Sequence, residues 1–152
     1  VDLAARMSFF IWGLPPDQTL IDLAARGDLS DEDVLEEQVE RMLADDRSEA
    51  LATRFAAQWL RLDDLEKVHP DRRMFPDFHQ RLADDLREET ETFFGALVRN
   101  DASIFDLYTA DYSYMNERVA RHYGIGGIVG EDFRRVEYPD ANDAESSDTE
   151  VC

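Results

Sequence analysis

The chain has 152 residues, 43% of them hydrophobic, which is enough for one ordinary domain with a buried core. Its net charge of −19 disfavours nucleic acid and anionic membrane surfaces as partners, because both are polyanions. Cys152 is the single cysteine, which excludes a disulfide framework and a cysteine-based metal site.

The start of the chain predicts no membrane segment. Its apolar run is short and follows Asp2, which is not a signal-peptide layout, and no run in the chain reaches the length of a membrane span. The first residue is Val1, and a helix-like pattern begins immediately after it. We therefore expect a piece of a longer polypeptide.

The first part of the chain predicts three helices with recognisable ends. Residues 3–12 carry an apolar face that ends at a glycine and a proline pair. Asp17 stands in the N-cap position of a second helix, which Gly27 closes. Ser30 opens a third helix that runs to about residue 44, since an aspartate follows at capping-box spacing. The other side of this helix is acidic, and its apolar stripe consists of Leu35, Val39 and Met42.

Two longer apolar stripes follow. A helix from about Ser48 presents one face that consists of Leu51, Phe55, Trp59 and Leu62. Residues 63–73 are predicted as a loop. The longest helical pattern covers residues 75–100, where Pro76 is tolerated in the first turn. The stripe of this long helix consists of Phe78, Leu82, Leu86, Phe93 and Leu97.

The end of the chain changes character. Asn116 is the predicted N-cap of a short helix that stops at Gly124, and the segment near Phe133 predicts a short strand or an extended arm. Residues 139–152 are acidic, small and polar, which indicates a disordered tail. We therefore predict an all-α bundle of about six helices over residues 1–138, followed by that tail.

The candidate site is a polar cluster of Glu89, His122 and Gln58. Glu89 lies about 60° from the centre of the long helix's stripe, and His122 and Gln58 have similar shoulder positions on two other helices. If these helices pack together, Glu89 and His122 could form an acid/base pair. The alternative is a hydrogen-bonded network that fixes the helix register, in which Arg54, Arg118 and Arg121 offer Glu89 further partners.

Metal and nucleotide signatures are weak in this sequence. The one Glu-x-x-His spacing, Glu66 to His69, falls in the segment predicted as a loop, so the paired helical motif of a di-iron bundle does not occur. Asp77-x-His79 offers only two ligands at a helix start. The glycines of residues 124–130 follow a helix, so they fail the test for a dinucleotide loop. There is no Gly-x-Ser-x-Gly nucleophile motif either. We predict no metal and no cofactor in this chain.

Four stretches together resemble one domain family. They are LAARMSFFIWGLPPD (residues 3–17), RMLADDRSEALATRFAAQWLRLDDL (41–65), ETETFF (89–94) and ADYSYMNERVARHYGI (110–125). In this order they resemble domain of unknown function fifteen-ninety-two, found in large exported proteins of planctomycetes and related bacteria. The resemblance implies an extracytoplasmic location, neighbouring domains of the parent protein as partners, and haem c in a neighbouring cytochrome module. The chain itself lacks the Cys-x-x-Cys-His haem motif.

The family pattern normally continues into a Gly/Leu-rich stretch where this chain has ANDAESSDTEVC, which implies a truncated or frame-shifted copy. Our leading hypothesis is a non-catalytic module, or a fragment of one, that scaffolds or docks neighbouring domains. The first alternative is an enzyme domain with an acid/base or metal site at Glu89 and His122. The second is a polysaccharide- or ligand-binding module that uses exposed Trp or Tyr.

Overall fold

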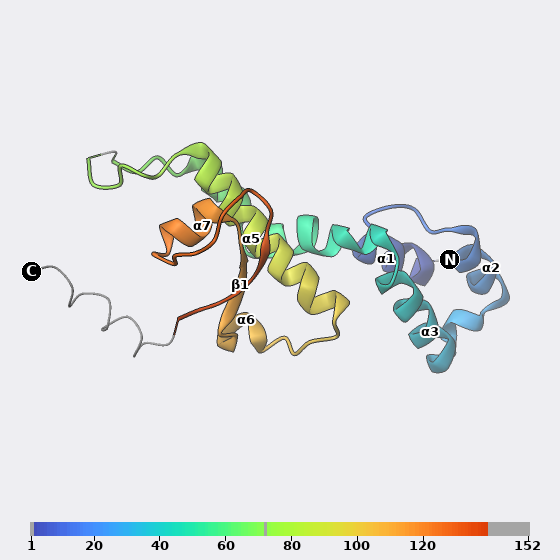
Figure 1. Ribbon diagram of the computed structural model, residues 1–152. Helices are drawn as coiled ribbons and strands as arrows, with labels where there is room; N and C mark the ends of the chain where they lie inside the picture. Colours follow the sequence, from blue (N-terminus) through green and yellow to red (C-terminus); the bar gives the residue numbers. More distant parts are fainter. Residues whose placement is uncertain (1, 72, 140–152) are drawn as a thin grey trace, which may run out of the picture. The chain divides into compact units, whose positions relative to one another are not determined.

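The computed structural model describes residues 2–71 and 73–139 (Figure 1). The predicted disordered tail lies outside the described residues, except for Pro139. Within these ranges the α-helices are α1 (Asp2–Ile11), α2 (Gln18–Arg26), α3 (Glu32–Leu43), α4 (Ala57–Trp59), α5 (Gln80–Arg99), α6 (Asp106–Thr109) and α7 (Glu117–His122). The 3₁₀ segments are η1 (Asp28–Ser30), η2 (Asp46–Glu49) and η4 (Leu62–Lys67), and η3 (Leu51–Ala56) is a π-helix.

The described chain is mostly helical, as predicted, but it also contains a small sheet. Strands β1 (Tyr112–Met115) and β2 (Arg134–Glu137) pair antiparallel, with Tyr112 opposite Glu137 and Met115 opposite Arg134. The predicted extended segment near Phe133 is therefore confirmed as a strand. β1 was not predicted, and its pairing with β2 qualifies the all-α expectation.

The chain divides into two compact units. Unit 1 comprises the described residues up to Asp64 together with Phe94–Ser103, and unit 2 comprises the described residues of Leu65–Phe93 with those from Ile104 onward. The long helix α5 contributes to both units (Figure 1). Each unit is described by itself below.

The core of unit 1 forms around Trp12. This side chain is buried, and its indole Nε1–H donates to the carbonyl oxygen of Met42 at 2.9 Å. The guanidinium of Arg47 lies 3.5 Å from the centre of the indole ring, and Asp45 pairs with Arg47 at 2.7 Å. The aromatic ring therefore packs against a cation that is itself neutralised.

Local capping signals in unit 1 are largely confirmed. Asp17 accepts from the backbone N–H of Leu20, and Gly27 closes α2 with φ +86°, a left-handed conformation that favours glycine. The predicted start at Ser30 is wrong by one residue: Asp31 is the N-cap of α3, because its carboxylate accepts from two backbone N–H groups of the first turn.

The predicted apolar face from Leu51 to Leu62 is only half correct. Leu51 and Leu62 are buried, whereas Phe55 is 39% exposed and Trp59 is 50% exposed. The cause is the π-helix η3, whose wider turn moves residues off the 3.6-residue period on which the prediction depended. Ala52 and Ala56 occupy the buried face instead.

Unit 2 has a core of its own. Met115, Val119 and Ala120 are fully buried, and further apolar side chains pack against them: Leu86, Ile125, Ile128, Phe133 and Val136. Asn116 caps α7 as predicted, accepting from the backbone N–H of Val119 at 3.0 Å. Side-chain hydrogen bonds join this part of the chain to α5: Ser113 on β1 donates to Glu89, and Arg118 on α7 donates to Asp85.

The long helix begins later than the sequence predicts. α5 starts at Gln80 instead of residue 75, because His79 acts as its cap: the ring Nδ1 and the backbone carbonyl of His79 both accept from Leu82 N–H. The preceding residues form turns, and two of their N–H groups, those of Met74 and Phe75, donate to the carbonyl of Asp71.

Candidate functional site

Glu89 is the most buried carboxylate among the described residues of unit 2, with 6% of its surface exposed. It lies on the middle of α5, beside the apolar stripe that the periodicity predicted. Ser113 on β1 donates its hydroxyl to Glu89 Oε1 at 2.6 Å, and the hydroxyl of Tyr123 donates to Oε2 at 2.8 Å. Each carboxylate oxygen of Glu89 therefore accepts a short hydrogen bond.

The electrostatics of this group follow from its burial. Loss of hydration raises the pKa of Glu89 above its ordinary value, although the two hydroxyls and the nearby His122 favour the charged form. Burial also raises the pKa of Tyr123, and the negative charge of Glu89 adds to that shift. Tyr123 consequently stays a hydrogen-bond donor across the physiological range.

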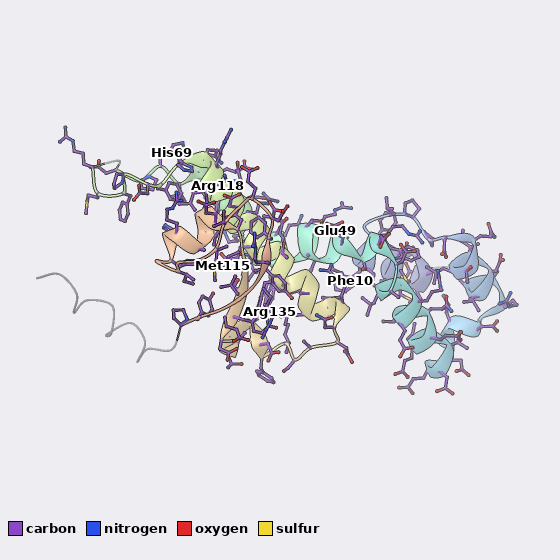
Figure 2. The ribbon with its side chains drawn as sticks, in the orientation of Figure 1. Phe10, Glu49, His69, Met115, Arg118 and Arg135 are labelled. Atoms are coloured by element: carbon purple, nitrogen blue, oxygen red, sulfur yellow. The ribbon has the colours of Figure 1, made fainter. Side chains whose placement is uncertain are left out.

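A second buried carboxylate, Asp85, lies one helical turn before Glu89. Arg118 on α7 (labelled in Figure 2) donates to both of its oxygens, through Nε and, at 3.2 Å, through Nη2. Burial opposes ionisation of Asp85, but hydrogen bonds from Arg118 and Asn116 and the charges of Arg118 and His79 outweigh it. The pKa of Asp85 is therefore below its ordinary value.

The structure places the three predicted site residues differently. Glu89 is buried, while His122 lies at the end of α7 with an exposed ring, near enough to influence Glu89 electrostatically. The groups hydrogen-bonded to the carboxylate are Ser113 and Tyr123. Gln58 belongs to unit 1, on α4, and is exposed. Of the predicted three, Glu89 and His122 lie in the same unit, and among the described residues no hydrogen bond joins Glu89 to His122 or to Gln58.

A hollow of about 300 Å³ lies beside this network, between the start of α5 and α7. It is lined by Pro76, Asp77, His79, Leu82, Arg118, Arg121 and His122. The two arginines disfavour a cation in the hollow, and the Nδ1 of His79 is already engaged with Leu82. Among the described residues, no group of three His, Cys, Asp or Glu side chains is placed to hold a metal ion.

A groove of about 1210 Å³ runs along α3 in unit 1. Its apolar lining consists of Leu35, Val39, Leu43 and Val98, all half-buried. Its acidic lining consists of Glu32, Glu36, Glu40, Asp45, Asp46, Glu49 and Asp101. Arg99 is the one basic residue among the described residues that line it. This groove is an apolar trough with an acidic rim.

The sequence contained the signal for this groove, but the signal was assigned to the core. Leu35, Val39 and Met42 were predicted to form one buried stripe. The structure buries Met42 and Gln38, four residues apart, and turns Leu35 and Val39 to the groove. The available signal was that Leu35, Val39 and Leu43 form an apolar line next to the acidic side of α3, where solvent exposure is expected.

Comparison with known proteins matches most of the chain to one family. The family model described as "Protein of unknown function (DUF1592)" matches residues 1–125. The chain belongs to this family. The DUF1592 match includes every residue of the groove lining and of the Glu89 network. The family match identifies the chain as an uncharacterised domain, in agreement with the resemblance in the sequence.

Two further searches return no relative for this DUF1592 chain. No curated protein and no solved structure matches it. Within the described residues, no helix has the length and apolar character needed to cross a membrane.

Proposed function

We propose that this chain is a non-catalytic helical module that scaffolds or docks neighbouring domains of a larger, exported, cytochrome-associated protein. The exported location, the neighbouring domains and the haem c of a cytochrome module come from the family resemblance. The chain's own contribution is binding and positioning.

The observation that supports this proposal is the state of Glu89, the best candidate for a catalytic group. Both of its oxygens accept hydroxyl hydrogen bonds, and little of its surface is exposed. A general acid or base must reach the proton that it transfers. Among the described residues, no buried side-chain nitrogen or oxygen lacks a partner, so these polar groups are already engaged within the fold.

The stability of a Glu89→Ala variant tests the proposal. In a structural network, alanine leaves the hydroxyls of Ser113 and Tyr123 without their acceptor, and we expect a loss of about 2 kcal/mol in the free energy of unfolding. Urea unfolding at pH 7 measures this. Glu88→Ala, on the exposed side of the same helix, is the matched control and should change stability by less than about 0.5 kcal/mol.

The opposite outcome supports the enzyme alternative at Glu89 and His122. Residues kept for catalysis are commonly neutral or costly for stability. If Glu89→Ala unfolds at the same urea concentration as the wild type, or at a higher one, the structural role is wrong and the scaffolding proposal loses its basis.

A second candidate function is binding of a neutral polysaccharide by exposed aromatic rings in unit 1. Trp59 is half-exposed and stacks on Phe55 with 6.1 Å between ring centres, while Phe10 meets Phe55 edge-on at 5.2 Å. Such rings offer a flat apolar surface at low conformational cost. Soluble glucans and xylans should then quench tryptophan fluorescence, and Trp59→Phe should abolish the change. If the quenching persists in Trp59→Phe, the fluorescence change comes from the buried Trp12, and this candidate function is contradicted.

A further inference from the structure

We propose that the groove along α3 binds a cationic amphipathic helix of a partner polypeptide. The inference rests on the proposed docking function and names the chemical class of the partner. It depends on three features of unit 1: the apolar floor of the groove, the carboxylates of its rim, and the length of α3.

The floor of the groove is a straight apolar line. Leu35, Val39 and Leu43 are four residues apart, so they follow one another along the same side of α3. Val98, from the last turns of α5, adds to the lining. All four side chains are only half-buried by the chain itself. They leave apolar surface that another apolar face could remove from water.

The rim of the groove carries carboxylates that the described chain does not neutralise. Glu32, Glu36 and Glu40 are also four residues apart, so they run parallel to the apolar line. Further rim carboxylates come from outside α3: Asp46, Glu49 (labelled in Figure 2) and Asp101. Within residues 2–71 and 73–139 none of these six forms an ion pair, whereas the neighbouring Asp45 is paired with Arg47.

The negative charge of the rim determines which charge a partner in the groove must carry. Seven acidic side chains face one basic side chain, Arg99, among the described residues that line the groove. Like charges at four-residue spacing repel one another on the free helix, and a row of Lys or Arg side chains relieves that repulsion. An acidic segment and a nucleic acid are disfavoured by the same charges.

The shape of the floor favours a helix as the occupant. An amphipathic helix places apolar residues three and four apart, which matches the spacing of the floor residues Leu35, Val39 and Leu43. Extended segments dock on an open sheet edge or, as polyproline helices, in a groove lined by aromatic rings. The described lining of this groove has neither a strand nor an aromatic residue. α3 has 12 residues and rises about 18 Å, so three to four turns of a partner helix match its length.

The test uses the full chain and a synthetic peptide of about 12 leucine and lysine residues, with the leucines on one helical face. Calorimetric titration at about 0.15 M salt suppresses unspecific attraction to the chain's overall charge. We expect micromolar binding. A peptide of the same composition in scrambled order, which has no apolar face, should bind at least about tenfold more weakly.

Matched double variants locate the binding site. Glu36→Gln with Glu40→Gln removes two rim carboxylates, and we expect it to weaken binding about fivefold. Asp33→Asn with Glu37→Gln makes the same charge change on the same helix, but outside the groove lining, and should alter affinity less than about twofold. Arg99→Gln removes the groove's opposing charge and should tighten binding.

The inference is overturned if both double variants weaken binding equally, or if the scrambled peptide binds as tightly as the amphipathic one. In either case the peptide responds to the overall charge and not to the groove. Failure of this test is distinguishable from failure of the proposed function. The latter is decided by the stability of Glu89→Ala, which does not involve the peptide.

Discussion

Two sets of carboxylates on the helices of this protein have opposite surroundings. In unit 2, Asp85 and Glu89 are buried, and each has hydrogen-bond donors on both oxygens. In unit 1, Glu36 and Glu40 are exposed beside an apolar trough and form no ion pair within the described part of the chain. All four residues are acidic groups on amphipathic helices, so residue type alone does not separate them.

In a chain of net charge −19, the surroundings of an acidic residue therefore indicate its role. A buried carboxylate without donors is costly, so the donors of Asp85 and Glu89 stabilise these two groups inside the fold. An exposed row of carboxylates repels itself and gains by meeting positive charge from outside. The first set should therefore affect stability, and the second should affect binding.

The largest loss of stability should follow removal of both donors to Glu89. The double variant Ser113→Ala with Tyr123→Phe leaves a buried carboxylate without a hydroxyl partner, and we expect a loss of about 3 kcal/mol in the free energy of unfolding. Each single variant should lose roughly half of that. Equilibrium urea unfolding measures all three, and a double variant within about 0.5 kcal/mol of the wild type would refute the stabilising role.

A smaller loss is expected at Asp85. Asp85→Asn keeps the size of the side chain but removes the charge that Arg118 binds, so stability at pH 7 should fall by about 2 kcal/mol. The adjacent Asp84 is exposed and provides the matched control: Asp84→Asn should leave the urea midpoint almost unchanged. Equal midpoints for the two variants would contradict the distinction between buried and exposed carboxylates.

The two buried carboxylates should respond to pH in opposite directions. The folded pKa of Asp85 is lowered, so its stabilisation is present above the unfolded value of 3.8 and is lost as the pH falls through the folded pKa. The folded pKa of Glu89 is raised, so the stabilisation that depends on its protonation is present below 4.5 and is lost as the pH rises through the folded pKa, whereas the hydrogen bonds from Ser113 and Tyr123 remain.

Unfolding of the wild type, Asp85→Asn and Glu89→Gln between about pH 3 and pH 8 checks these signs. The difference in the free energy of unfolding between wild type and Asp85→Asn should widen as the pH rises from its lowest value. The corresponding difference between wild type and Glu89→Gln should narrow above pH 4.5. Two differences that move in the same direction would show that one of the two environments is wrongly described.

The smallest effect on stability is expected in the groove. Glu36→Gln with Glu40→Gln should change the free energy of unfolding by less than about 0.5 kcal/mol, with a slight gain because a like-charge pair four residues apart is removed. Thermal unfolding at low salt measures it. A loss above about 1 kcal/mol would mean that these carboxylates support the fold.

Local signals carried the sequence predictions that succeeded. Asp17, Gly27 and Asn116 were identified as helix ends because a cap depends on residues within one turn. The burial of Glu89 followed from the period of α5. Its partner Ser113 was not predicted, because that residue lies on β1, and β1 exists through pairing with a strand about twenty residues later.

The predictions that failed concern helices whose geometry or packing departs from the simple period. The π-helix η3 moved Phe55 and Trp59 out of the core, because its wider turn does not follow the 3.6-residue period on which the prediction depended. On α3 packing buries the side with Met42 and the polar Gln38 in preference to the apolar line with Leu35 and Val39. The period of apolar residues alone does not predict that a side with a glutamine is the buried one.

A chemical-shift map of the ¹⁵N-labelled chain during titration with the amphipathic leucine–lysine peptide tests most directly whether the two sets of carboxylates differ in role. We expect shifts confined to the groove, around Leu35, Val39, Leu43 and Val98, with the amides of Ser113 and Tyr123 unchanged. Shifts centred on the Glu89 network, or spread evenly over the acidic residues of both units, would contradict the division between carboxylates that hold the fold and carboxylates that bind a partner.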